Sequence, residues 1–386
     1  VKPKMKGKYY KLKESLSFCI FIQIGMLPLI IYFQYEAPAF SFLANVAAVP
    51  LATCAFTLAF LLIFLPYTVF HEAISWMIQG VLWISRQSYG MLTIGHVPFL
   101  WVLLFYFMTG LWIWKKNGQN RHIRISLAYV IMIILIWIPM ARRKSLAFLD
   151  VGQGDCFVAD TKSGAIIFDG GSSSEDQVGR YRILPYMNLG YQKIQIAVIS
   201  HMDIDHYSGI KELLEMGKIK YLGLPEIPKD ETMKKIIGIA KKRGTTIFYL
   251  SRGRQITTKD GSLKVLHPQK NSQMEKNAAS LVMQGKILGY RVLLTGDVEK
   301  EGEEELLSEE LERADILKAA HHGSKNSTSN EFLQKVQPKQ TVISCGKQNR
   351  YGHPHLETIH RLQTYHTKIY RTDRSGAIIF FKRRDG

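Results

Sequence analysis

The chain contains 386 residues, enough for more than one domain, and carries a formal net charge of +18 at pH 7. This charge favours an anionic partner, either nucleic acid or anionic lipid, although part of it belongs to basic residues that flank apolar runs. Four cysteines without a closely spaced pair exclude a disulfide framework and a cysteine-held metal, so any metal must use histidines and carboxylates.

Long apolar runs dominate the chain up to about Ala141, whereas the sequence from about Lys144 onward has the composition of an ordinary α/β domain. Uncharged runs of this length can cross the ~30 Å hydrocarbon core of a bilayer. The predicted spans lie in four runs, Ser15–Phe33, Ala37–Phe70, Val97–Trp114 and Ile125–Ala141. Prolines Pro50 and Pro66 break the second run, which therefore predicts one span plus a re-entrant or interfacial piece.

The distribution of basic residues predicts how the chain is oriented. The Lys-rich stretch that starts at Val1 and the basic loop from Lys115 to Arg124 should both be cytoplasmic, and one further crossing then places the C-terminal domain on the extracytoplasmic side. The cluster Arg142-Arg143-Lys144 argues for the opposite side. Because no signal-peptide cleavage pattern follows Val1, we expect the predicted transmembrane region, residues 1–141, to be truncated at its N-terminus.

From Ser145 onward, short strand-like runs alternate with helical patterns. The predicted strands include residues 146–149, 165–168, 196–199, 291–294 and 377–380, and helical patterns occupy 209–216 and about 303–312. This alternation predicts an α/β sandwich of mixed sheets covered by helices, over residues 145–386.

The most informative motif is Ser200-His201-Met202-Asp203-Ile204-Asp205-His206, which directly follows the predicted strand 196–199. A loop at the carboxyl end of a strand is where α/β folds place ligands. In this loop His201 and Asp203 can turn towards one metal ion, while Asp205 and His206 turn towards a neighbouring ion. The alternative interpretation is a polar loop whose aspartates cap a helix.

Two further motifs place candidate ligands at strand ends. The run Leu293-Leu294-Thr295-Gly296-Asp297 ends in a carboxylate that could bridge two cations or be an ordinary turn residue. The run Leu317-Lys318-Ala319-Ala320-His321-His322-Gly323-Ser324 places two histidines after another strand-like segment. One of His321 and His322 is predicted to bind metal and the other to assist catalysis, and the sequence does not choose between them.

The order His-x-Asp-x-Asp-His, then Gly-Asp, then His-His-Gly-Ser resembles the metallo-β-lactamase superfamily. Three further runs sharpen the resemblance: Leu149-Asp150-Val151-Gly152-Gln153-Gly154-Asp155, Asp169-Gly170-Gly171 and Gly352-His353-Pro354-His355. With the apolar runs upstream, the whole chain is similar to the C-terminal part of ComEC-type DNA-uptake channels. The resemblance implies a four-layer αββα fold for residues 145–386, in a multi-pass protein of a bacterial cell membrane.

Two departures from the superfamily pattern bear on the metal. The usual second histidine of the first motif is Asp203 here, and the usual middle histidine has no match in the stretch that holds Asn277 and Ser280. The first metal position is therefore oxygen-rich. Two divalent ions are expected, either Zn²⁺ or Mn²⁺, with Mg²⁺ as a third candidate, because carboxylates suit Mn²⁺ and Mg²⁺ better than an all-histidine site does.

The motifs together define the candidate site. The predicted metal ligands are His201, Asp203, Asp205, His206, Asp297, His321 and His322. Catalytic roles are predicted for the four residues that could orient or activate water, bridge the ions or protonate a leaving oxygen, namely Asp205, Asp297, His321 and His322. The candidates for substrate binding are Ser324, Lys325, His353 and His355.

The resemblance implies a function in DNA uptake. The membrane region would pass single-stranded DNA, and the C-terminal domain would be a metal-dependent phosphodiesterase that degrades the strand that is not imported. The expected partners are DNA, the lipid bilayer and other proteins of the competence machinery. Two alternatives stay open: a membrane-anchored hydrolase of a small anionic ester or lactone, and a non-catalytic DNA-binding gate that keeps the fold without the activity.

Overall fold

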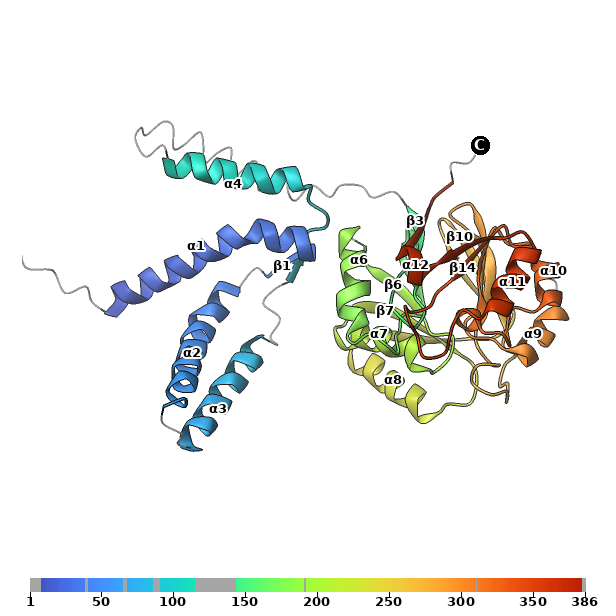
Figure 1. The fold of residues 1–386 in the computed structure, drawn as a ribbon, viewed down its shortest axis with the longest axis horizontal. Coiled ribbons are helices and arrows are strands. Elements are labelled where there is room, and N and C mark those ends of the chain that lie inside the picture. The colour runs from blue at the N-terminus through green and yellow to red at the C-terminus, as the bar shows by residue number, and fades with distance from the viewer. Residues whose placement is uncertain are drawn as a thin grey trace, which may run out of the picture. The chain divides into compact units, whose positions relative to one another are not determined.

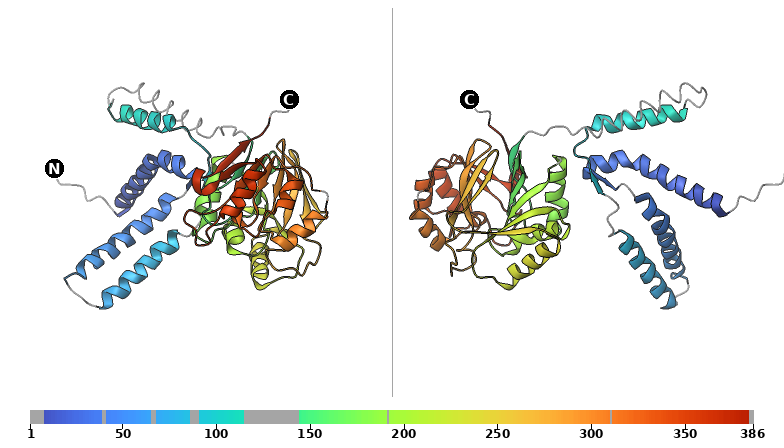
Figure 2. Two further views of the ribbon diagram at one scale, coloured as in Figure 1. Left: turned by 45° about the vertical axis from the view of Figure 1, so that its right-hand side comes forward. Right: turned by 180° about the vertical axis from the view of Figure 1, so that it is seen from behind.

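The computed structural model describes residues 8–38, 41–64, 68–85, 91–114, 144–190, 192–309 and 311–383. Its internal contacts divide the chain into two compact units. The N-terminal unit comprises Val1–Met140 with Asn188–Tyr191, and the C-terminal unit comprises Ala141–Met187 with Gln192–Gly386. Figures 1 and 2 show the ribbon of each unit.

The described part of the N-terminal unit is built from helices and one small sheet. Its helices are α1 (Lys8–Gln34), α2 (Ser41–Leu61), α3 (Thr68–Ser85) and α4 (Phe99–Trp114). Strands β1 (Glu36–Pro38) and β2 (Met91–Thr93) pair in antiparallel fashion. Helices α2 and α3 lie side by side as a hairpin, which both views of Figure 2 show.

Helix α2 has the length and composition of a membrane span. Among the described residues, Ala44–Leu61 is the one segment that meets both criteria, while α1 and α4 contain the shorter apolar stretches Ile20–Gln34 and Phe99–Leu111. Pro50 lies inside α2 and does not end it. Large apolar side chains are exposed on these helices, as on surfaces that contact lipid or protein. The predicted span Ile125–Ala141 lies outside the described residues.

The C-terminal unit contains two seven-stranded sheets. The first sheet has the order β16-β3-β4-β5-β6-β7-β8. Its strands are β3 (Ser145–Phe148), β4 (Phe157–Thr161), β5 (Gly164–Phe168), β6 (Ile194–Val198), β7 (Ile219–Pro225), β8 (Thr246–Leu250) and β16 (Ile378–Phe381). The second sheet has the order β15-β14-β13-β12-β11-β10-β9. Its strands are β9 (Gln255–Thr258), β10 (Gly261–His267), β11 (Val282–Ile287), β12 (Tyr290–Leu294), β13 (Ile316–Lys318), β14 (Gln340–Ile343) and β15 (Lys368–Arg371).

Helices cover the outer face of each sheet, so the unit is the four-layer αββα sandwich that the sequence predicted (Figure 1). The first outer layer consists of η1 (Gly179–Ile183), α6 (Leu184–Leu189), α7 (Ile204–Glu215) and α8 (Glu231–Lys242). The second consists of α9 (Lys300–Leu307), α10 (Asn330–Val336) and α11 (Leu356–Thr364). Two short helical turns, η2 (Ala320–Gly323) and α12 (Thr372–Ser375), follow strands β13 and β15.

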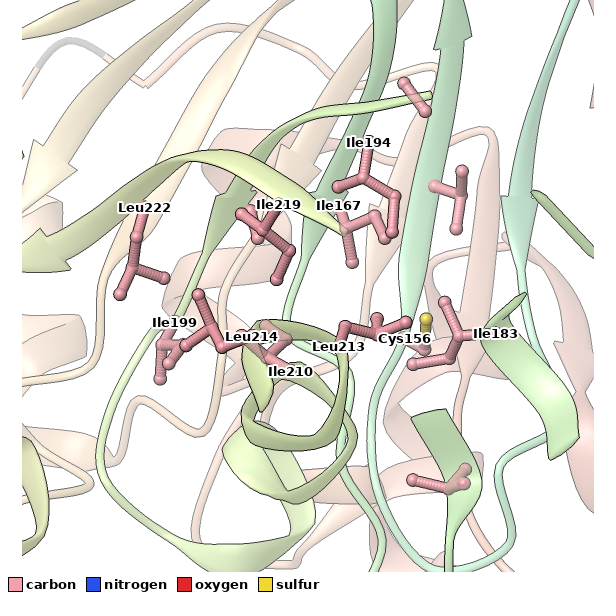
Figure 3. Close-up of a cluster of buried hydrophobic side chains, with 14 of the residues drawn as sticks. Cys156, Ile167, Ile183, Ile194, Ile199, Ile210, Leu213, Leu214, Ile219 and Leu222 are labelled. Atoms are coloured by element: carbon pink, nitrogen blue, oxygen red, sulfur yellow. The ribbon is translucent and has the colours of Figure 1, made fainter. Parts of the chain in front are cut away.

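Three buried cores hold these layers together. The first joins the first sheet to α7 and α8, and Figure 3 shows its members Ile167, Leu213 and Leu222. The second fills the space between the sheets, and the third joins the second sheet to α9, α10 and α11. In β5, Ile167 belongs to the first core and Ile166 to the second, because alternate side chains of a strand point to opposite faces. Burial on both faces explains why these strands are almost uninterruptedly apolar.

The candidate ligands gather because parallel strands end at a common edge of each sheet. Strands β5 and β6 pair in parallel in the first sheet, and β12 and β13 do so in the second. Asp169 follows β5, the motif of residues 200–206 follows β6, Asp297 follows β12 and His322 follows β13. The predicted placement of these motifs directly after strands is therefore confirmed.

Candidate metal centre

Four buried side chains from both sheets converge in the C-terminal unit. They are Asp155, His206, Asp297 and His322, and each offers one ligand atom within 4.8 Å of the others. On the side of the first sheet, Asp155 lies between β3 and β4 and His206 lies in the first turn of α7. On the side of the second sheet, Asp297 follows β12 and His322 lies in η2. The group of four thus lies where the two halves of the sandwich meet.

Each of the two histidines in this group is fixed through its Nδ1 atom. The Nδ1 of His206 lies 2.9 Å from Oδ2 of Asp169, and the Nδ1 of His322 lies 2.9 Å from the carbonyl oxygen of Ser344. Both Nε2 atoms then point at Oδ2 of Asp297, each at 3.3 Å. An Nδ1 donor bond of this kind orients a metal-binding imidazole and leaves Nε2 as the ligand atom.

Close backbone packing brings the loops together. A Cβ atom on Gly171 would lie 2.5 Å from the carbonyl oxygen of Ile204, and one on Gly154 would lie 2.2 Å from the carbonyl oxygen of Gly171. Real Cβ atoms do not approach other atoms so closely, so both positions require glycine. Gly154, next to Asp155, and Gly171, two residues after Asp169, therefore let these loops pack against the start of α7, which carries His206.

The two carboxylates of the group are buried and lie beside cationic side chains. Burial raises the pKa of Asp155, but the nearby Lys318 and His322 outweigh it and lower this pKa to about 2. The pKa of Asp297 is held well below its usual range by His206, His322 and Lys318 in spite of burial. These carboxylates are therefore ionised at neutral pH, which is the state in which a carboxylate can bind a metal ion.

An independent observation supports a metal ion at this centre. The Nε2 atoms of His206 and His322 and Oδ1 of Asp155 are buried without a hydrogen-bond partner, whereas Oδ2 of Asp155 contacts Lys318. Buried polar atoms without partners are costly unless an ion or water satisfies them. Two imidazoles and two carboxylates suit Zn²⁺ or Mn²⁺, so the donor set agrees with the metals expected from the sequence.

A buried lysine belongs to the same cluster, and the sequence analysis missed it. The ammonium of Lys318 contacts Oδ2 of Asp155, lies 3.3 Å from Oδ1 of Asp297 and donates to the carbonyl oxygen of Gly296 at 2.8 Å. A lysine inside the apolar run of β13 was the available signal, because lysines are almost never buried unless they are paired. Asp155 and Asp169 belong to motifs that carry the family resemblance, but the sequence alone did not predict a role for them at the centre.

The predicted ligands His201 and Asp203 lie outside the group of four. The Nδ1 of His201 lies 3.0 Å from Oγ of Ser200 and 3.3 Å from Oγ of Ser280, while its buried Nε2 lies 3.7 Å from Oδ2 of Asp203. Asp203 is more exposed and lies 3.6 Å from the ammonium of Lys276. Ser280 thus occupies the neighbourhood of His201, in the stretch where the usual middle histidine is missing.

The structure distinguishes His321 from His322. His322 is buried in the group of four, whereas His321 is partly exposed, with its Nδ1 3.1 Å from Oε1 of Glu299 and its Nε2 3.8 Å from Oδ2 of Asp297. Asp205 approaches the group from the other side, with Oδ2 3.5 Å from Nε2 of His322. His322 therefore belongs to the group of four, and His321 lies beside it.

A cavity of about 300 Å³ opens beside the group of four. It is lined by Gln153, Ser173, Asp203, Ile204, Asp205, Asn277, Asp297, His321, His322, Arg350, Tyr351 and His353. Of the predicted substrate-binding residues, His353 lines this cavity. Ser324, Lys325 and His355 are not part of the lining: Ser324 is buried, and the Nδ1 of His355 accepts a hydrogen bond from the backbone of Lys325 at 3.3 Å.

Comparison with known protein families matches both parts of the chain. Residues 149–347 match the model described as "Metallo-beta-lactamase superfamily", and residues 2–119 match the model described as "Competence protein". The first match covers the C-terminal unit from the end of β3 to the loop after β14. The second covers helices α1 to α4 in full.

Three curated proteins are similar to the chain. "ComE operon protein 3" of Bacillus subtilis is 31% identical over 94% of this chain and 51% of its own length. "Competence protein ComA" of Neisseria gonorrhoeae is 31% identical over 61% of this chain and 32% of its length. "Recombination protein 2" of Haemophilus influenzae is 27% identical over 68% of this chain and 32% of its length. The chain therefore spans about half or less of the length of these relatives.

Proposed function

The chain belongs to the metallo-beta-lactamase superfamily, and from this premise we propose that its C-terminal unit is a divalent-metal-dependent phosphodiesterase that acts on DNA. The observation that carries the proposal is the buried group of four beside a cavity that Arg350 and His353 also line. Ligands for a cation and a basic group at one cavity are the two elements that hydrolysis of a phosphodiester requires.

The group of four would supply the ligands of the metal ion. His206, His322, Asp297 and Asp155 would hold a divalent ion, which would neutralise phosphoryl oxygens and lower the pKa of an attacking water. A second ion, as expected from the sequence, would use His201 and Asp203 with Asp297 as the shared ligand.

Groups at the cavity wall could accept and donate the protons of the reaction. Asp205 lines the cavity and could accept a hydrogen bond from the attacking water. The Glu299 carboxylate lies 3.1 Å from Nδ1 of His321, and Nε2 of this ring lies 3.8 Å from Oδ2 of Asp297. In this position His321 could deliver a proton to the leaving oxygen.

We propose that the N-terminal unit belongs to a DNA-uptake path through a bacterial membrane. The match of residues 2–119 to the competence family and the names of the relatives support this part of the proposal. The path would carry a single strand, and the C-terminal unit, on the extracytoplasmic side, would degrade the other strand together with further proteins of the competence machinery. The span-like helix α2 and the predicted span outside the described residues would anchor the chain.

Digestion of labelled DNA by the full chain in detergent tests the enzymatic part. We expect cleavage that needs added Mn²⁺ or Zn²⁺ and stops with a chelator. The variant Asp297→Asn should lose turnover while it still binds DNA, because it removes a central ligand charge without touching the basic wall. A matched exposed control, Glu304→Gln, should cleave like the wild type.

The same assay separates the two alternatives. A hydrolase of a small anionic ester would cleave such esters, show no affinity for DNA and respond little to salt. A non-catalytic gate would bind DNA, and neither the wild type nor Asp297→Asn would cleave it. Either result would contradict the proposed nuclease.

A further inference from the structure

We propose that Tyr351, together with Arg350, forms a subsite at the mouth of the cavity that stacks one unpaired base of single-stranded nucleic acid. This inference rests on the proposed function and names the substrate class of the same site. The observation behind it is a row of aromatic rings that leads from the metal ligands to the surface.

The row begins at the buried ring of His322. The ring of His353 lies 6.2 Å from that of His322 and 5.5 Å from that of His321, measured between ring centroids. The ring of Tyr351 stacks on His353 at 5.7 Å with an interplanar angle of 24°. A base that extends this stack would lie beyond Tyr351, and its strand could run back along the row of rings towards the ligand cluster.

The outer end of the row is open. Tyr351 is 43% exposed although it contacts both His353 and Arg350. The guanidinium carbon of Arg350 lies 4.9 Å from the ring centroid, and its Nη2 donates to the tyrosine hydroxyl at 2.7 Å. An exposed aromatic ring beside an arginine is a typical platform for bases, since the ring stacks and the cation attracts phosphate.

The loop that carries Tyr351 is held in place by hydrogen bonds. Nδ2 of Asn349 donates to the carbonyl oxygens of Gly346 and His353 at 2.9 and 2.6 Å, and its Oδ1 accepts from the backbone N–H of His353 at 2.9 Å. The backbone N–H of Gly346 donates to Oε1 of Gln153 at 3.1 Å. Because the loop is fixed at its base and across its turn, the platform needs little ordering when a substrate binds.

The charge of the surrounding residues favours an approach of the strand past Arg350 and Tyr351 over an approach through the neighbouring cavity. A larger cavity of about 870 Å³ shares Asp203 and Asn277 with the first. Its lining contains five carboxylates against two lysines, namely Asp203, Glu275, Glu299, Glu301 and Glu304 against Lys276 and Lys300. A phosphate backbone is repelled there, so the strand should approach over Arg350 and Tyr351.

Stacking on an exposed ring requires a base with a free face, which a paired and stacked duplex base lacks. The test compares two substrates in the full chain with bound Mn²⁺: a single-stranded oligonucleotide, and one of equal length in which the nucleosides are replaced by abasic sugars. We expect the wild type to show a KM about tenfold higher for the abasic strand, in the range that one base–aromatic stack produces.

Variants of Tyr351 then locate the effect. Tyr351→Ala and Tyr351→Leu should reduce the KM ratio of the two substrates to about one, since leucine keeps apolar bulk without a flat ring. Tyr351→Phe should keep the ratio. Tyr181→Ala, at an exposed tyrosine that does not line the cavity, is the matched control and should keep it as well.

The outcomes separate the two proposals. If the wild type cleaves both strands but the ratio is near one, or stays near ten in Tyr351→Ala, the stacking subsite is wrong and the nuclease stands. If the wild type with Mn²⁺ neither binds nor cleaves either strand, the proposed function fails, and the subsite fails with it.

Discussion

Lys318 is buried between two carboxylates of the group of four, which is an unusual place for a lysine. Lys318→Met keeps the bulk of the side chain but leaves Asp155 and Asp297 without their fixed cation. Removing one partner of a buried ion pair costs about 3–5 kcal/mol. We therefore expect a lower melting temperature without metal, and a larger rise when Mn²⁺ is added than the wild type shows.

Differential scanning fluorimetry across a Mn²⁺ titration measures both effects. The control is Lys339→Met, because Lys339 also pairs with an aspartate, at 3.0 Å from Asp315, but is exposed. Equal metal responses in wild type and Lys318→Met would mean that Lys318 does not share the carboxylates with the ion.

His267 gives the C-terminal unit a pH dependence that is separate from the metal centre. It is buried, and its Nε2 lies 3.1 Å from the carbonyl oxygen of Ala278, which requires a proton on Nε2. Burial and the charge of Arg252 lower the pKa of His267 from 6.5 to about 4. The unfolded chain therefore binds a proton that the folded chain does not, and stability is lost as the pH falls from about 6.5 towards 4.

The expected loss over this interval is about 3 kcal/mol, since each pKa unit corresponds to about 1.4 kcal/mol. Urea unfolding at pH 7 and at pH 4.5 measures it. His267→Gln should be less stable at pH 7 but should lose less stability on acidification. The exposed His360→Gln should follow the wild type, and a parallel pH response in all three proteins would contradict the assignment to His267.

At the scale of elements, helix α9 holds the loop that delivers His322. The carboxylate of Glu303 accepts hydrogen bonds from the backbone N–H groups of Thr328 and Ser329, a few residues after η2. Arg361 of α11 binds the same loop through the carbonyl oxygens of Ser327 and Thr328, at 2.8 and 3.1 Å. Helices α9 and α11 of the second outer layer thus hold the loop that follows His322.

Glu303→Ala would leave two backbone donors near α9 without a partner. A buried unsatisfied donor costs about 1–3 kcal/mol, so we expect unfolding by urea to occur at a lower concentration and Mn²⁺ affinity to fall. Isothermal titration with Mn²⁺ measures the second effect. Glu304→Ala, one residue along the same helix and exposed, should change neither quantity.

The sequence predicted the positions of the strands and helices more accurately than the composition of the site. The predicted strand at 165–168 became β5 (Gly164–Phe168), and 291–294 became β12 (Tyr290–Leu294), because apolar runs bounded by turns identify buried strands. The helix expected near residues 303–312 is α9 and ends at Leu307. Helix ends depend on local capping and on neighbouring loops, which periodicity does not report.

The composition of the centre could be predicted only in part. His206, Asp297 and His322 were named as ligands because each follows a strand in a recognisable motif. Asp155 lies in the loop after β3 and Lys318 at the end of β13, in different halves of the sandwich, and no sequence spacing encodes their contact. The metal-binding roles of all these residues, including His201 and Asp203, stay predictions, as does the expectation of two ions.

At the scale of the whole molecule, a bound metal should act as a cross-link between the halves of the C-terminal unit. Asp155 and His206 belong to the first sheet, and Asp297 and His322 belong to the second. An ion held by all four stabilises the folded state by about 2.7 kcal/mol at one hundred times its Kd. We expect a chelator to lower the melting temperature of the full chain, with full recovery after Mn²⁺ is added.

The control for this experiment is Asp297→Asn, which should melt at nearly the same temperature with and without the chelator. A chelator effect of equal size in wild type and Asp297→Asn would place the stabilising ion elsewhere in the molecule.

The pairing of β3 with β16 has a consequence for how the protein is made. Strand β3 (Ser145–Phe148) opens the sandwich, and its antiparallel neighbour on one side, β16 (Ile378–Phe381), comes from the far end of the same unit. During synthesis β3 must therefore wait with one edge unpaired until almost the whole unit has left the ribosome. An unpaired edge is a template for association with other strands. The chain's slowest and most aggregation-prone moment in biogenesis should thus be the interval before β16 arrives, and ribosome-stalled chains that stop short of Ile378 should be the ones that chaperones retain.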